Sequence, residues 1–223
     1  MKILFNLLFI PHFLYSASYI DYQSPFHPVV GTSGMVVSQN YMSSDIGIEI
    51  LNKGGNAVDA AVAVGFSLAI TLPRAGNLGG GGFMMVYIAE KDEIYFIDYR
   101  SKSPLNASIK KIFDLDPDLK FKPEDFKNEM FDKTRYGYRA SAIPGTVAGL
   151  IDAHNNFGKL PLDKVLAPVI KQAQEGILVS YDLHMAIKDT FQLKEDAESS
   201  KIFFKDGKAI PQNSILKRPD LAK

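Results

Sequence analysis

The spacing of apolar residues predicts two helices in the first third of the chain. Apolar positions recur at helical intervals within 43–53 and stop at Gly54, a residue suited to the left-handed backbone found at many helix ends. Asn56 can then cap a second helix, with Asp59 in its first turn near the positive end of the helix dipole. Because the run 57–70 carries no charge after Asp59, we expect this helix to be buried on nearly all sides.

Extended segments are predicted on either side of this helix pair. Residues 34–38 have the composition of a short strand, and residues 83–88 and 94–98 flank a polar stretch as the two arms of a β-hairpin. The glycine-rich segment 76–82 lies just before the hairpin. Each glycine loses much backbone freedom on ordering, so this segment predicts a tight connection with little side chain.

The second half of the chain is predicted to be mainly helical. Helical patterns occupy 144–158 and 162–175, and each is followed or ended by glycine. Ser180 caps a further helix. Its apolar positions are spaced four residues apart, at Leu183, Ile187 and Phe191. Residues 106–140 are charged, aromatic and aperiodic, which is typical of a long surface excursion.

Composition narrows the classes of function. The 223 residues are 46% hydrophobic and 22% charged, within the ordinary globular range. Lys plus Arg and Asp plus Glu both number 25, so no basic excess favours nucleic acid or an anionic membrane surface. The absence of Cys excludes disulfides, thiolate metal sites and Cys nucleophiles, and the four His are too scattered for a helical metal-binding pair. We expect neither a metal nor a cofactor.

The N-terminus is typical of a targeting segment. Lys2 precedes a mostly apolar stretch, and small residues suited to cleavage stand at 16–18. The alternative, a first buried strand or helix, is weakened by apolar residues on every side of it. We therefore divide the chain into a signal peptide at 1–18, an extended lead-in at 19–33 and a folded part at 34–223. The mature protein is expected to be exported, periplasmic or extracellular, without a membrane span, since the apolar stretch is shorter than the ~20 residues a span needs.

Few residues indicate a reaction by themselves. No Walker-type phosphate loop and no G-x-S-x-G nucleophile elbow is present. Arg100 lies just past a predicted strand, where a guanidinium could leave the sheet and bind a carboxylate through two hydrogen bonds. Taken alone, an arginine at a strand end is more simply a solvated or locally paired charge. His154 and His184 on helix faces are likewise better interpreted as core or surface residues than as general bases.

Four segments in order nevertheless resemble a known family. They are residues 54–61 (GGNAVDAA), 76–84 (GNLGGGGFM), 98–100 (DYR) and 144–149 (PGTVAG). Together they are similar to the large-subunit half of γ-glutamyltransferase, also called glutathione hydrolase, from about Gly34 to the last residue. The resemblance implies an α/β fold, the αββα sandwich of N-terminal nucleophile hydrolases, here as an incomplete large-subunit fragment. It also implies glutathione or another γ-glutamyl small molecule as donor and water or an amino acid as acceptor.

The resemblance assigns one binding residue and no catalytic residue. Arg100 matches the family arginine that grips the α-carboxylate of the γ-glutamyl group, although Tyr99 stands where Phe is common. The family nucleophile lies in a Thr-Thr-His-like motif at the start of the small subunit. No threonine here is adjacent to another or followed by His; they are Thr32, Thr71, Thr134, Thr146 and Thr190. We therefore expect this chain alone to be inactive, to lack its small catalytic subunit, and to expose an uncovered apolar face and open sheet edges.

Two alternatives remain. The chain could be a non-catalytic γ-glutamyl-binding or subunit-type protein that keeps the Arg100 pocket. It could instead be a related N-terminal nucleophile acylase that acts on another amide. Arg100 argues against the acylase, because substrates without an α-carboxylate have less use for that guanidinium.

Overall fold

The computed structural model describes residues 29–108, 136–137 and 140–223, and the chain divides into two units, Met1–Met35 and Val36–Lys223. Only residues 29–35 of the first unit are described, and they contain no helix or strand. The signal peptide, most of the lead-in, most of the excursion at 106–140 and Thr134 lie outside the described residues, so those interpretations stay predictions.

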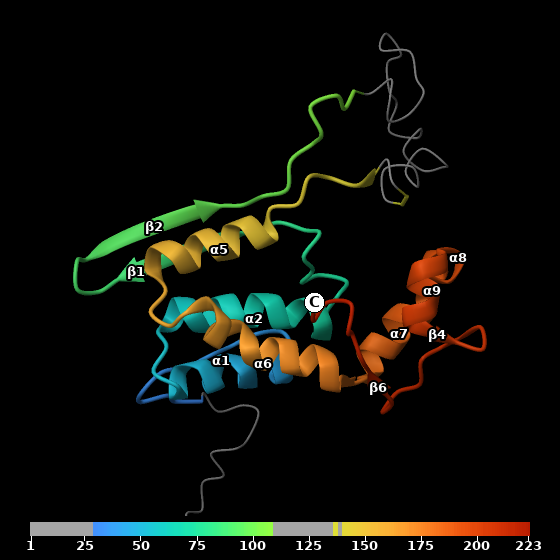
Figure 1. The fold of residues 1–223 in the computed structure, drawn as a ribbon, viewed down its shortest axis with the longest axis horizontal. Coiled ribbons are helices and arrows are strands. Elements are labelled where there is room, and N and C mark those ends of the chain that lie inside the picture. The colour runs from blue at the N-terminus through green and yellow to red at the C-terminus, as the bar shows by residue number, and fades with distance from the viewer. Residues whose placement is uncertain (1–28, 109–135, 138–139) are drawn as a thin grey trace, which may run out of the picture. The chain divides into compact units, whose positions relative to one another are not determined.

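Helices dominate the described part of the second unit, with short antiparallel strand pairs between them (Figure 1). In chain order the elements are α1 (Tyr41–Asn52), α2 (Ala57–Thr71), β1 (Phe83–Ile88), β2 (Glu93–Asp98), α5 (Thr146–Phe157), α6 (Leu162–Glu175), β3 (Ile177–Leu178), α7 (Tyr181–Asp189), α8 (Phe191–Glu195), α9 (Ala197–Phe203), β4 (Phe204–Lys205), β5 (Lys208–Ala209) and β6 (Ile215–Leu216). This mixture agrees with the predicted α/β class, and the predicted helix pair, hairpin and next two helices are confirmed.

Side-chain caps begin both of the first two helices; the cap of α2 at Asn56 is the predicted one, whereas α1 begins at Tyr41, ahead of the predicted range 43–53, with Asn40 as its cap. The Asn40 side chain accepts a hydrogen bond from the Met42 amide at 2.9 Å, and Gly54 beyond α1 has a left-handed φ of 87°. At α2 the Asn56 side chain accepts from the Asp59 amide, while the Asp59 carboxylate accepts from the Asn56 amide, both at 2.9 Å. This capping box satisfies two amides that a helix start leaves free.

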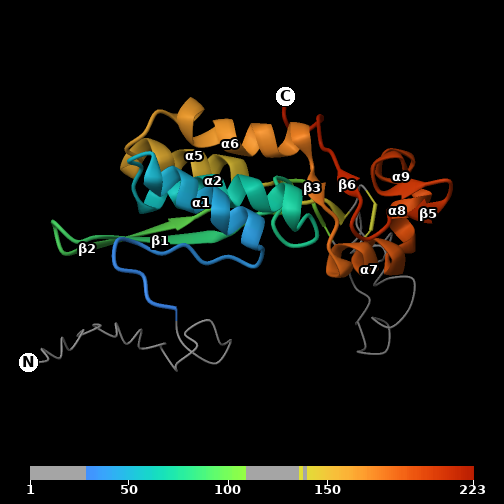
Figure 2. The same ribbon diagram turned by 90° about the horizontal axis from the view of Figure 1, so that it is seen from below.

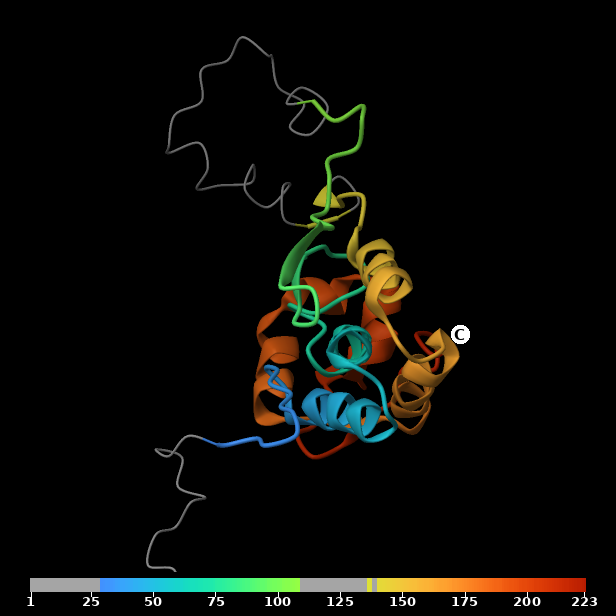
Figure 3. The same cartoon turned by 90° about the vertical axis from the view of Figure 1, so that its left-hand side faces the viewer.

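Helix α2 forms the centre of the second unit. It packs against α1, α5 and α6, and Figure 3 shows it between α1 and the α5–α6 pair. Ten of its 15 residues are buried, which confirms the prediction from its missing charges. A buried chain of hydrogen bonds joins α1, α2 and α6: the Ser43 hydroxyl bonds those of Ser67 and Thr71 at 2.8 Å each, and Ser67 donates to Gln172 at 2.7 Å.

The β1–β2 hairpin covers the helices with one face only. The strands are antiparallel, with Met85 opposite Phe96, and the face that packs on the core includes the buried Val86. Figure 2 shows α1, α2 and α5 on the same side of the hairpin. The opposite face is exposed and apolar; it consists of Phe83, Met85, Tyr87, Ile94 and Phe96. This set, hereafter the open face, matches the uncovered apolar surface that the sequence predicts.

Two predicted elements are wrong. Residues 34–38 form no strand in the described structure; instead the Val36 side chain lies so close to α1 that a Cβ on Gly47 would come within 2.7 Å of it. The helix expected to run through Phe191 stops at Asp189. The Thr190 hydroxyl there donates to the Ala186 carbonyl at 2.7 Å, a short new helix begins at Phe191, and the Phe191 side chain is 61% exposed.

Candidate functional site

Arg100 lies immediately after β2 on a backbone fixed from both sides. Tyr99 and Gly82 exchange backbone hydrogen bonds of 3.1 and 3.3 Å, which extends the hairpin pairing by one residue pair. Lys102 and Ile143 exchange bonds of 3.1 and 2.8 Å beyond it. The Arg100 amide itself donates to the Asp98 carboxylate at 2.9 Å. The exposed Arg100 side chain therefore projects from a segment that is held in place.

Three of the four sequence motifs meet at this segment. The glycine-rich connection is tied to the start of α5, because Gly145 and Thr146 both donate to the Gly80 carbonyl, at 2.8 and 3.2 Å. The same connection is bonded to Tyr99 through Gly82. The motifs at 76–84, 98–100 and 144–149 are thus one structural unit around Arg100. This arrangement agrees with the tight connection expected for the glycine-rich segment 76–82.

The guanidinium of Arg100 differs from those of the other described arginines. Arg74 donates to both carboxylate oxygens of Asp182, at 3.0 and 2.9 Å. Arg218 binds Asp220 with its shortest hydrogen bond at 2.7 Å, and this bond lowers the pKa of the Asp220 carboxyl below its usual value. The Arg100 guanidinium has no hydrogen bond or ion pair with any residue that the structure describes.

The fourth motif, at 54–61, stabilises the fold. Its Asp59 side chain is fully buried and accepts hydrogen bonds from the backbone amides of Lys159 at 3.0 and 3.1 Å and Leu160 at 3.1 Å. His154 lies beside it, with Nε2 3.7 Å from the Asp59 Oδ1 and 2.8 Å from the Leu160 carbonyl, to which it must donate. The sequence predicts that Asp59 lies in the first turn of α2, but it does not predict the hydrogen bonds to amides about 100 residues away. His154 is a core residue, as expected, and His184 bonds the Ile210 carbonyl at 2.7 Å.

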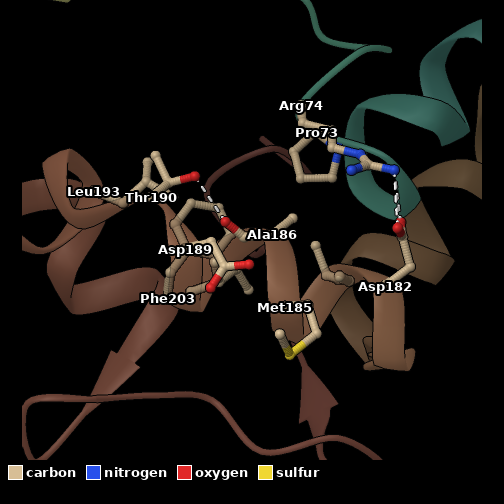
Figure 4. Close-up of a pocket in the computed structure, with 11 residues that line it drawn as sticks. Pro73, Arg74, Asp182, Met185, Ala186, Asp189, Thr190, Leu193 and Phe203 are labelled. Carbon is tan, nitrogen blue, oxygen red and sulfur yellow. Dashed lines mark hydrogen bonds and ion pairs between the residues drawn. The ribbon is translucent and has the colours of Figure 1, made fainter.

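A cavity of about 530 Å³ lies elsewhere in the second unit (Figure 4). It is bordered by Pro73 and Arg74 and by side chains of α7 to α9, and Arg100 does not line it. Its one cation, Arg74, is already paired with Asp182, so the described lining offers no free cation to a carboxylate ligand. Across the described residues we find no cluster of His, Cys, Asp or Glu able to hold a metal, and no helix with the length and apolar character to cross a membrane.

Comparison with known proteins identifies a family. Residues 43–223 match the family model described as gamma-glutamyltranspeptidase. The glutathione hydrolase proenzyme of Escherichia coli K12 is 38% identical over 208 residues, which are 92% of this chain and 34% of that protein. The crystal structure of Helicobacter pylori gamma-glutamyltranspeptidase superimposes with a TM-score of 0.75 at 34% identity, covering 87% of this chain and 54% of that one.

A more distant structure, the cephalosporin acylase of Bacillus halodurans, superimposes with a TM-score of 0.67 over 89% of this chain and 37% of that one. The two sequences are 22% identical, a level that shows a shared fold alone. The chain spans about a third of the length of the curated relatives it matches, at their N-terminal portion. The family model covers most of the chain, residues 43–223. The chain therefore belongs to the gamma-glutamyltranspeptidase family.

Proposed function

We propose that this chain is part of an exported γ-glutamyltransferase or glutathione hydrolase, and that Arg100 binds the α-carboxylate of the γ-glutamyl group. The observation that carries the proposal is the guanidinium of Arg100, which projects from a fixed backbone and has no partner among the described residues, whereas Arg74 and Arg218 are both paired. A guanidinium can bind a carboxylate through two parallel hydrogen bonds, which fixes the orientation of the ligand as well as its position.

Such orientation serves the reaction of the family. With the α-carboxylate held, the γ-carbonyl carbon faces a nucleophile and no other carbonyl of the donor competes. The nucleophile is an N-terminal threonine hydroxyl; its own α-amine accepts the proton, the γ-amide bond breaks, and water or an amino acid then takes the glutamyl group. This sequence holds no Thr-Thr-His-like motif, so the small catalytic subunit would have to supply the hydroxyl.

The proposal includes the αββα sandwich. The β1–β2 hairpin would belong to one of its two sheets, and the open face would be covered by strands that this chain does not contain. If strands outside this sequence complete the sheet and the donor pocket, residues 1–223 alone should bind the donor weakly.

The acylase alternative is less supported, since the acylase comparison reaches 22% identity whereas the glutathione hydrolase of E. coli reaches 38%. The binding-protein alternative assigns the same role to Arg100, but it predicts a higher affinity of the chain for glutamate than the enzyme-fragment proposal does. One exposed guanidinium–carboxylate pair supports a Kd no tighter than about 1 mM, whereas a complete binding pocket would reach the micromolar range.

Titration with L-glutamate, followed by NMR at the arginine Nε–H groups, tests the proposal on the full chain. We expect the Arg100 signal to shift at millimolar glutamate, the shift to vanish in Arg100→Ala, and Arg100→Lys to bind more weakly because an ammonium cannot form the two-pronged pair. Arg74→Ala is the matched control, since it removes a guanidinium already bound to Asp182. Hydrolysis of a γ-glutamyl anilide should stay at background.

An unchanged Arg100 signal at tens of millimolar glutamate would overturn the assignment of Arg100. Micromolar affinity would favour the binding protein over the fragment of an enzyme. Turnover of the anilide by the purified chain, lost in Arg100→Ala, would show that the nucleophile lies within this sequence.

A further inference from the structure

Four glycines from two separate motifs surround the residue that precedes Arg100. A Cβ on Gly82 would lie 2.8 Å from the Tyr99 Cε2, and a Cβ on Gly149 would overlap the Tyr99 Cγ and Cβ. On the backbone side, a Cβ on Gly145 would overlap the Tyr99 carbonyl oxygen, and one on Gly81 would overlap the Ser101 amide nitrogen. Tyr99 is therefore enclosed on its ring and on its main chain by positions where no side chain fits.

Close approach, rather than backbone conformation, requires glycine at these positions. None of the four glycines has a positive φ, whereas Gly54 and Gly176 elsewhere in the chain do. An alanine could therefore adopt the local backbone at Gly149, and it would ordinarily favour a helix by about 1 kcal/mol over glycine. The three atoms nearest to such a Cβ all belong to Tyr99, and they are the first atoms of its side chain, so rotation of the ring cannot relieve the overlap.

The hydroxyl group of Tyr99 also has a defined position. Its hydroxyl lies 3.4 Å from the Phe83 carbonyl at the start of β1, and burial raises the pKa of the Tyr99 phenol above its usual value. The ring thus lies between the start of the hairpin and the first turn of α5, while its main chain continues directly into Arg100.

We propose that Tyr99 is a positioning residue for Arg100: held between Gly82 and Gly149, it fixes the point from which the guanidinium projects. This inference rests on the proposed function of Arg100 and adds the element that orients it. A displaced backbone moves the whole guanidinium relative to its ligand, and displacements near 1 Å can cost about 100-fold when geometry is demanding.

Gly149→Ala is the main test. Gly79→Ala, in the glycine-rich segment that also holds Gly82, is its control, since a Cβ there would meet only the Asn77 side chain at 3.4 Å. We expect Gly149→Ala to weaken the glutamate response of Arg100 at least about fivefold and to increase the NMR-detected mobility of the Arg100 amide, while Gly79→Ala changes neither. Circular dichroism confirms that each variant remains folded.

Tyr99→Ala and Tyr99→Phe test whether Tyr99 positions Arg100 without adding atoms to the packed core, as Gly149→Ala does. We expect Tyr99→Ala to mobilise Arg100 as Gly149→Ala does, and Tyr99→Phe to keep binding within about twofold.

The amide mobility requires no ligand, so it distinguishes the two proposals. If the wild-type chain ignores glutamate but Gly149→Ala mobilises Arg100, the proposed function fails and the positioning of the segment stands. If Arg100 is equally ordered and equally responsive in Gly149→Ala and Tyr99→Ala, Tyr99 does not position it.

Discussion

Replacing Asp59 with alanine should destabilise the second unit more than any change to a surface carboxylate. The Asp59 side chain is fully buried, and its two oxygens accept hydrogen bonds from the amides of Asn56, Lys159 and Leu160. One carboxylate therefore joins the start of α2 to the connection between α5 and α6.

The magnitude follows from these three amides. A hydrogen bond to a charged group contributes about 1.5–3 kcal/mol, and a buried donor left without a partner costs about 1–3 kcal/mol. The gain from no longer desolvating the carboxylate offsets part of this loss. We therefore expect Asp59→Ala to lower the free energy of unfolding by about 3 kcal/mol, and Asp59→Asn by about half as much because one acceptor oxygen remains.

Urea denaturation followed by circular dichroism measures this difference. With a slope of about 2 kcal/mol per molar urea, the midpoint of Asp59→Ala should fall by about 1.5 M. Asp45→Ala, at an exposed position in α1, is the control and should change stability by less than about 0.5 kcal/mol. Hydrogen exchange should also accelerate at the amides of Lys159 and Leu160. A loss below about 1 kcal/mol for Asp59→Ala would refute the view that this carboxylate ties the loop to α2.

Two further predictions concern the hairpin and its neighbourhood. The open face should bind a hydrophobic dye and promote self-association. Phe96→Glu, at a side chain 62% exposed, should reduce both dye binding and self-association, while Tyr41→Glu on α1 should reduce neither. Equal self-association in the two variants would contradict this role of the open face. Burial raises the pKa of Tyr99 above the usual value of 10.0, so the stability it contributes is complete below about pH 10 and is lost as the pH rises through the raised value. A carbon-13 titration of the tyrosine rings should show Tyr99 ionising late, and Tyr99→Phe should lose less stability than wild type at alkaline pH.

Local signals in the sequence were sufficient for most elements. The cap at Asn56 and the uncharged run after Asp59 predicted a buried helix, because capping groups and residue spacing act within one or two turns. The two apolar segments on either side of a polar stretch likewise predicted the hairpin. The sequence failed at Phe191, where spacing suggested one continuous helix but the Thr190 side chain bonds the preceding turn and the chain begins again.

What the sequence determined by itself was the helices α1, α2, α5 and α6, the hairpin and, through four ordered motifs, the family. The tertiary structure decided which of these motifs contact one another. Gly82 and Gly149 are far apart in the chain, and only folding brings both against Tyr99; Asp59 likewise reaches amides that lie 100 residues beyond it. Close approach and shared hydrogen bonds are properties of pairs of distant residues, so no local pattern can encode them, whereas helix caps and periodicity are properties of neighbours.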